Sequence, residues 1–102
     1  MTQTSVEAVK ARLDAGETLN LVDVREDHER ADFNIGGIHH KLGLIQAMQV
    51  DELEALKDQE VIVYCRSGNR STQACLILDT IGFTNTVNLA GGMLAWEEKF
   101  GR

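Results

Sequence analysis

The sequence predicts an α/β domain with a mainly parallel central sheet flanked by helices. Three short apolar runs, at residues 19–24, 61–64 and 86–89, show little polar alternation, which is typical of parallel strands covered on both faces. Segments with helical periodicity lie between and around them, and strands that alternate with helices indicate this fold class. The chain has 102 residues, 43% of them hydrophobic, and contains no repeat or linker. We therefore expect a single domain over residues 1–102.

The first helix is expected to precede the first strand and to end near Ala15. Thr4 and Glu7 have the spacing of a capping box, and apolar residues then recur at helical spacing until Gly16. The run at 19–24 follows directly and is the first predicted strand.

The remaining helices follow from the same kind of pattern. A polar stretch at 26–32 and an amphipathic segment at 50–56 predict two short helices separated by a loop. Between Ser71 and Gly82 the apolar residues form one stripe, and Gly82 is a natural helix stop. An amphipathic helix at 93–100 ends the chain after the strand at 86–89.

Composition excludes several functional classes. The formal net charge is −6 and the pI is near 4.9, which argues against nucleic acid or an anionic membrane as the main partner. The N-terminus lacks the pattern of a signal peptide, and no apolar run has membrane-spanning length, so we expect a cytoplasmic protein. Cys65 and Cys75 are a poor framework for a structural disulfide, and no CxxC pair occurs. We predict neither a metal nor another cofactor.

Cys65 is the candidate nucleophile. Residues 61–71, VIVYCRSGNRS, deliver this cysteine from an apolar strand into a short turn that a helix follows at once. A thiol attacks as its thiolate, and both a helix N-terminus and nearby guanidinium groups lower a cysteine pKa. In open α/β sheets, ligands also bind beyond the carboxyl ends of the strands. The turn is thus predicted to be a site for a small anion.

The other residues of this turn are candidates for substrate binding. Arg66 and Arg70 each present a planar fork of donors that suits an oxyanion, and the prediction is firmer for Arg70. Gly68 supplies backbone freedom that lets successive amides point inward. Ser67 and Asn69 either hydrogen-bond a substrate oxygen or satisfy the turn backbone, and the second use is the commoner one.

Three nearby features are interpreted as structural. Ser71 is expected to cap the following helix and to support the loop. Cys75 lies at the edge of the apolar stripe and is interpreted as a small core residue rather than a resolving thiol. Trp96 and Phe100 are spaced as a helical aromatic pair, which favours packing over ligand stacking.

Four motifs resemble the rhodanese family of sulfurtransferases, and their order and spacing match as well. They are DVRE at 23–26, CRSGNRS at 65–71, IGF at 81–83 and NLAGGMLAW at 88–96. The resemblance covers nearly the whole chain. It implies that Cys65 attacks the outer sulfur of thiosulfate or another sulfane donor, holds the sulfur as a persulfide, and passes it to a thiophilic acceptor. The acceptor would be cyanide in vitro and a thiol or protein thiol in the cell. By the same resemblance, Asp23 and Arg25 would support the loop through hydrogen bonds.

The chain departs from the family pattern at residues 33–43, FNIGGIHHKLG, where both prolines of the usual motif are missing. His39 and His40 could ligate a metal or act as a base. Adjacent residues of an extended segment face opposite ways, however, and no other ligand cluster is evident. We interpret them as surface or pocket-rim residues that, with Lys41, add positive potential near the loop.

Two other functions stay open at this point. A rhodanese-like module can serve recognition or regulation without turnover, although the presence of Cys65 argues against that reading. Cysteine-dependent phosphatases and arsenate reductases also use a strand-loop-helix turn, but they usually place one residue more between cysteine and arginine than the four between Cys65 and Arg70. The smaller cradle favours sulfur chemistry. The natural donor and acceptor, the pathway and the oligomeric state do not follow from the sequence.

Overall fold

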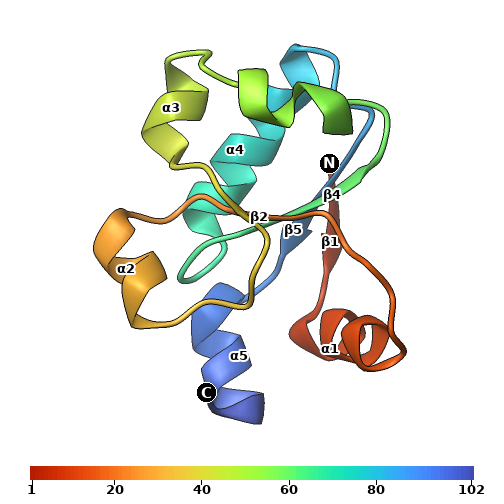
Figure 1. The fold of residues 1–102 in the computed structure, drawn as a ribbon, viewed down its shortest axis with the longest axis vertical. Coiled ribbons are helices and arrows are strands. Elements are labelled where there is room, and N and C mark those ends of the chain that lie inside the picture. The colour runs from red at the N-terminus through yellow and green to blue at the C-terminus, as the bar shows by residue number, and fades with distance from the viewer.

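The computed structural model describes all 102 residues, and its centre is a five-stranded sheet (Figure 1). The strands are β1 (Thr2–Thr4), β2 (Leu21–Asp23), β3 (Ile38–His39), β4 (Glu60–Tyr64) and β5 (Asn85–Leu89). Their order across the sheet is β1-β5-β4-β2-β3, and every neighbouring pair is parallel. The predicted α/β class with a mainly parallel sheet is confirmed.

Helices cover both faces of the sheet. They are α1 (Val6–Asp14), α2 (Asp27–Asp32), α3 (Leu42–Gln46), the 3-10 helix η1 (Asp51–Leu56), α4 (Asn69–Thr80) and α5 (Gly92–Phe100). In Figure 1, α3, η1 and α4 occupy the upper half of the view, and α1 and α5 occupy the lower half. Each group packs on its own face of the sheet.

The alternation of side chains along β4 divides the core into two clusters. Val61 and Val63 pack with residues of α3, η1 and α4, whereas Ile62 and Tyr64 pack with residues of α1 and α5. All four are essentially inaccessible to solvent. Because β4 is buried on both faces, its sequence is a continuous apolar run rather than an alternating one. On the second face, Trp96 packs into the core and contacts Phe100 edge to face with ring centroids 5.1 Å apart.

The N-terminal segment differs from the prediction. Residues 2–4 form the edge strand β1, and Ser5, not Thr4, caps α1 by accepting a hydrogen bond from the Ala8 amide at 3.1 Å. The three residues of β1 are polar and pair with β5 through their backbone. A strand defined by backbone pairing alone carries no apolar pattern, which is why the sequence suggested a helix cap instead.

The segment between β2 and β4 contains more structure than the sequence predicts. The helix predicted at 26–32 is present as α2, and the segment at 50–56 is helical but of the 3-10 type. β3 and α3 lie between them and were not predicted. Elements this short show too few apolar repeats for periodicity to be recognised. No helix of the protein is both long enough and apolar enough to span a bilayer.

Candidate active site

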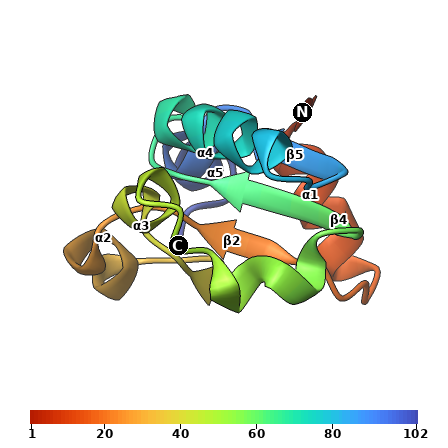
Figure 2. The same cartoon turned by 90° about the horizontal axis from the view of Figure 1, so that it is seen from above.

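The turn between β4 and α4 lies at the carboxyl end of β4 (Figure 2). Cys65 is its first residue, directly after this central strand. Gly68 is the N-cap of α4 and has a φ of +103°, a conformation that a residue with a side chain adopts only under strain. The prediction that Ser71 caps this helix is wrong. This residue lies inside the first turn of α4, where its amide and hydroxyl face the thiol instead.

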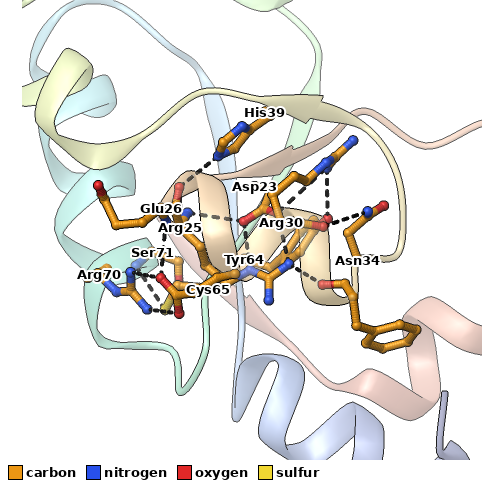
Figure 3. Close-up of polar contacts among 12 residues, drawn as sticks. Asp23, Arg25, Glu26, Arg30, Asn34, His39, Tyr64, Cys65, Arg70 and Ser71 are labelled. Carbon is orange, nitrogen blue, oxygen red and sulfur yellow. Dashed lines mark hydrogen bonds and ion pairs between the residues drawn. The ribbon is translucent and has the colours of Figure 1, made fainter.

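The Cys65 sulfur lies within a ring of hydrogen-bond donors. Its Sγ accepts hydrogen bonds from the Gly68 amide at 3.1 Å and the Ser71 amide at 3.4 Å. The Ser71 hydroxyl is also 3.4 Å away, and Figure 3 shows Cys65 and Ser71 side by side. Burial raises the pKa of the Cys65 thiol, but the hydrogen bonds from Ser71, Gly68 and the Ser67 amide act against it. Their sum is larger, so the pKa lies below the ordinary thiol value.

The same ring leaves little of the cysteine accessible. Only 1% of Cys65 is exposed, and the residue forms part of the core cluster on the α4 face. The predicted site for a small anion would call for a more accessible sulfur than this. The structure therefore provides the electrostatic environment of a nucleophile in a narrow cradle, which admits at most a small reagent in the conformation described.

Arg70 is held by a carboxylate rather than left free for an anion. Its Nη1 and Nη2 donate to Glu29 Oε1 and Oε2 at 2.7 and 2.8 Å, a bidentate pair that joins the first turn of α4 to α2. The Arg70 guanidinium lowers the Glu29 pKa to about 2, and burial opposes this shift. The sequence does not predict this ion pair, because the two residues are 41 positions apart.

Arg66 is the loop guanidinium without a protein partner. It is exposed and makes no side-chain hydrogen bond or ion pair within the chain. It borders a hollow of about 230 Å³ beside the loop, whose lining is strongly charged. The lining residues are Arg25, Glu29, Asp32, Arg66, Met93, Leu94, Glu97 and Arg102. Of the two loop arginines, Arg66 is thus the one available to a bound anion, the reverse of the order that the sequence suggested.

Asp23 and Arg25 form a buried ion pair next to the loop (Figure 3). Arg25 Nε and Nη2 donate to the two Asp23 carboxylate oxygens at 2.9 and 3.0 Å, and Nη2 also donates to the Phe33 carbonyl at 2.6 Å. The guanidinium lies over the Tyr64 ring, 5.6 Å from its centroid. Arg25 thus ties the end of β2 to the chain after α2 and borders the hollow beside Arg66. The Asp23 and Arg25 side chains make no hydrogen bond to the loop itself.

The glycine pair that begins α5 packs against the backbone of the loop. The Met93 and Leu94 amides donate to the Cys65 and Arg66 carbonyls, each at 3.0 Å. A Cβ added to Gly92 would lie 2.4 Å from the Cys65 carbonyl oxygen, and the φ of this glycine is +54°. The motif NLAGGMLAW, quoted above from its resemblance to the family, therefore has a steric role at the site: only a glycine allows α5 to approach the loop this closely.

The remaining candidates lie outside the sulfur cradle. Ser67 and Asn69 are exposed, and their side chains make no hydrogen bond within the chain. Cys75 is fully buried in the core, and burial is the main factor that raises its pKa to about 11, so the core interpretation is supported by its position.

The two histidines are tied to backbone carbonyls. His39 Nε2 lies 2.7 Å from the Arg25 carbonyl oxygen and His40 Nε2 lies 2.6 Å from that of Gln49. His40 is only 3% exposed, so the expectation of a surface position is wrong for it, although it does line a second hollow, of about 470 Å³, between α3 and η1. Lys41 pairs with Asp27 at 3.3 Å.

Two residues of the site carried no assigned role at the sequence level. Glu29 binds Arg70, and Asn88, in β5, accepts a hydrogen bond from the Ser71 hydroxyl. Asn88 is the first residue of the NLAGGMLAW motif, and its place in that motif is the only signal that the sequence offers for it.

Comparisons with known proteins agree on the family. The family model described as rhodanese-like domain matches residues 5–99. The chain is 44% identical over 97 residues to YtwF of Bacillus subtilis (strain 168), covering 93% of this chain and 89% of that protein. It is 40% identical over 91 residues to a sulfurtransferase of Allochromatium vinosum, covering 88% and 82%. Among solved structures, the human single-domain sulfurtransferase TSTD1 has a TM-score of 0.79 and 25% identity, with 97% of each chain covered. The chain therefore belongs to the rhodanese-like family, whose members include sulfurtransferases.

Proposed function

We propose that the protein is a sulfurtransferase that takes the outer sulfur of thiosulfate, or of another sulfane donor, and passes it through a Cys65 persulfide to a thiol acceptor. The observation that supports this most is the pair of amide donors to the Cys65 sulfur, with the Ser71 hydroxyl in contact with it and a thiol pKa below its ordinary value. Such donors stabilise negative charge on sulfur without a metal or an added group. The membership in the rhodanese-like family supports the same chemistry.

The first half-reaction is a displacement at sulfur. The Cys65 thiolate attacks the outer sulfur of thiosulfate and forms a new S–S bond. The bond between that sulfur and the sulfonate sulfur breaks, and sulfite leaves with the electron pair. The product is the Cys65 persulfide anion, so the negative charge moves outward by one sulfur atom.

The loop offers donors for this displaced charge. The amides of Asn69 and Arg70 begin α4 and have no acceptor within the protein. Amides at a helix N-terminus point out of the helix end and favour a negative charge there. In the second half-reaction an acceptor thiolate attacks the outer sulfur, which leaves with the acceptor as its persulfide, and the Cys65 thiolate is restored.

Arg66 is the residue that we assign to the sulfonate end of the donor. It is exposed, free of a carboxylate partner, and directly follows Cys65. A guanidinium can bind two oxyanion oxygens at once and stays charged at any working pH. Arg70, which Glu29 already engages in a bidentate pair, would contribute positive charge and the position of the loop.

Intact-mass measurement after incubation with thiosulfate tests the proposal. We expect a one-sulfur adduct on the native protein that is lost when a thiol acceptor is added. Cys65→Ser should form no adduct, whereas Cys75→Ser, the matched control at the second cysteine, should form it normally. The absence of an adduct with thiosulfate and with a persulfide donor would contradict sulfur transfer and favour a recognition module. Parallel assays with p-nitrophenyl phosphate and arsenate would reveal the phosphatase or arsenate reductase alternative.

A further inference from the structure

Three uncharged side chains extend the hydrogen bonds of the thiol to the edge of the sheet. The Ser71 hydroxyl, 3.4 Å from Cys65 Sγ, donates to Asn88 Oδ1. The Asn88 Nδ2 in turn donates to Gln3 Oε1 at 2.8 Å. Ser71 is 0% exposed and Asn88 is 3% exposed, so their polar atoms depend on these partners. This hydrogen-bond chain runs from Cys65, just after the central strand β4, to the edge strand β1.

The pairing of two strands holds this hydrogen-bond chain in place. Gln3 and Asn88 are register partners on the parallel strands β1 and β5, so their side chains stand side by side on one face. On its other side the Asn88 carboxamide borders the loop, because a Cβ added to Gly68 would lie 3.7 Å from Asn88 Nδ2. Asn88 therefore lies between the edge strand and the loop that surrounds the sulfur.

The direction of these hydrogen bonds matters because the Ser71 hydroxyl has a single proton to donate. A serine hydroxyl has one proton, and here it is given to Asn88 Oδ1. The Ser71 oxygen can then only accept from Cys65, which requires a protonated thiol. A Cys65 thiolate needs the opposite arrangement, in which the Ser71 hydroxyl donates to sulfur.

That opposite arrangement is available if two carboxamides turn over. The Asn88 Nδ2 would then donate to the Ser71 oxygen, and the Gln3 amide nitrogen would donate to Asn88 Oδ1. The two orientations of a carboxamide have nearly the same shape, so no other atom has to move. Gln3 is exposed and can turn in solvent. The hydrogen bonds that link Ser71, Asn88 and Gln3 can be made in both arrangements, one of which fits the thiol and the other the thiolate.

We infer that Asn88 is a positioning residue for the nucleophile: its carboxamide directs the Ser71 hydroxyl toward the Cys65 thiolate, and Gln3 completes the chain from the edge strand. The inference rests on the proposed role of Cys65. Arg70 and Cys75, both on α4, interact electrostatically with Cys65, and neither is altered in the test.

The test measures the alkylation rate of Cys65 by iodoacetamide as a function of pH, with the modified site located by mass spectrometry. Asn88→Leu removes the carboxamide but keeps the volume, and it should raise the apparent Cys65 pKa by about one unit. Alkylation at pH 7 should then be about tenfold slower than in the native protein. Ser71→Ala should have a similar effect. Because Asn88 acts through Ser71, adding Asn88→Leu to Ser71→Ala should change nothing further.

Gln3→Glu provides a second variant, at an exposed position where folding is not at risk. Its carboxylate can accept from Asn88 but cannot donate, so it should favour the thiol arrangement and raise the Cys65 pKa. Thr2→Glu, one residue away on β1, controls for the added charge. The inference would be overturned if the Cys65 pKa of Asn88→Leu equalled that of the native protein. It would also be overturned if Asn88→Leu shifted the Cys65 pKa equally in the native background and in the Ser71→Ala background. If Asn88→Leu does not fold, equal Cys65 pKa values in Gln3→Glu and Thr2→Glu would overturn it. Alkylation needs no sulfur donor, so this result is independent of whether the protein transfers sulfur.

Discussion

The ion pair between Glu29 and Arg70 makes a specific prediction about stability. Glu29→Gln removes the charge but keeps an oxygen that can accept from the Glu26 amide, as Glu29 does at 3.1 Å. The fall of the Glu29 pKa from 4.5 to about 2 corresponds to an upper bound of about 3 kcal/mol. The side chains are 17% and 31% exposed, and solvent screening reduces the value, so we expect a loss of about 1–2 kcal/mol at pH 7.

The sign of the pH dependence follows from the direction of the shift. The folded Glu29 pKa is lower than the unfolded one, so the stabilisation is complete above about pH 5 and is lost as the pH falls toward 2. Urea titrations give the unfolding free energy that Glu29→Gln loses relative to the native protein. This loss should be the same at pH 7 and pH 5, and smaller by roughly 40% at pH 3.5. Glu98→Gln, an exposed position without an ion pair, is the matched control. A deficit in Glu29→Gln that is absent at pH 7, or that does not change with pH, would refute the reasoning.

Three further predictions concern the loop and its neighbours. Arg66→Ala should raise the KM for thiosulfate about tenfold or more, and Arg66→Lys should recover only part of the loss; steady-state kinetics with an unchanged KM would remove Arg66 from the donor site. Gly92→Ala should cost about 2–4 kcal/mol in urea unfolding, because its Cβ would lie 2.4 Å from the Cys65 carbonyl oxygen. Gly43→Ala, in a helix with nothing within 4 Å, should be neutral or stabilising, and similar losses in both variants would contradict the steric argument. In the folded protein, the rate at which iodoacetamide alkylates Cys65 should rise with pH with a midpoint below the ordinary thiol pKa of 9.0. Cys75, with its pKa of about 11, should stay unmodified at pH 8. Comparable alkylation rates at the two thiols would exclude this difference.

The parts of the fold that follow from the sequence are those with a local pattern. β4 and α4 each bury a continuous set of apolar residues, so their periodicity predicts the strand, the helix and the turn that contains Cys65. The parallel direction of the strands follows because helices lie between them in the sequence. β1 and β3 escaped prediction because two or three residues that pair through their backbone leave no side-chain signal.

The partners of the site were harder to predict than its nucleophile. Cys65 and the loop arginines are neighbours in sequence, so their shared chemistry can be recognised there. The pairing of Arg70 with Glu29, and of Ser71 with Asn88, depends on how separate elements meet around the turn. For this reason the sequence ranked Arg70 above Arg66 as the anion ligand, whereas the structure leaves Arg66 as the unpaired guanidinium. Composition and spacing identify which groups are available, and only the packing shows which of them are already engaged.

The hydrogen bonds from the first turn of α5 to the Cys65 and Arg66 carbonyls have a consequence for substrate size. The turn cannot widen without breaking these two hydrogen bonds, so we expect a bulky reagent to reach the sulfur only when the beginning of α5 opens. Discrimination against large donors would then be set by the stability of a helix terminus, and solution conditions or substitutions that loosen α5 would broaden the range of molecules that react.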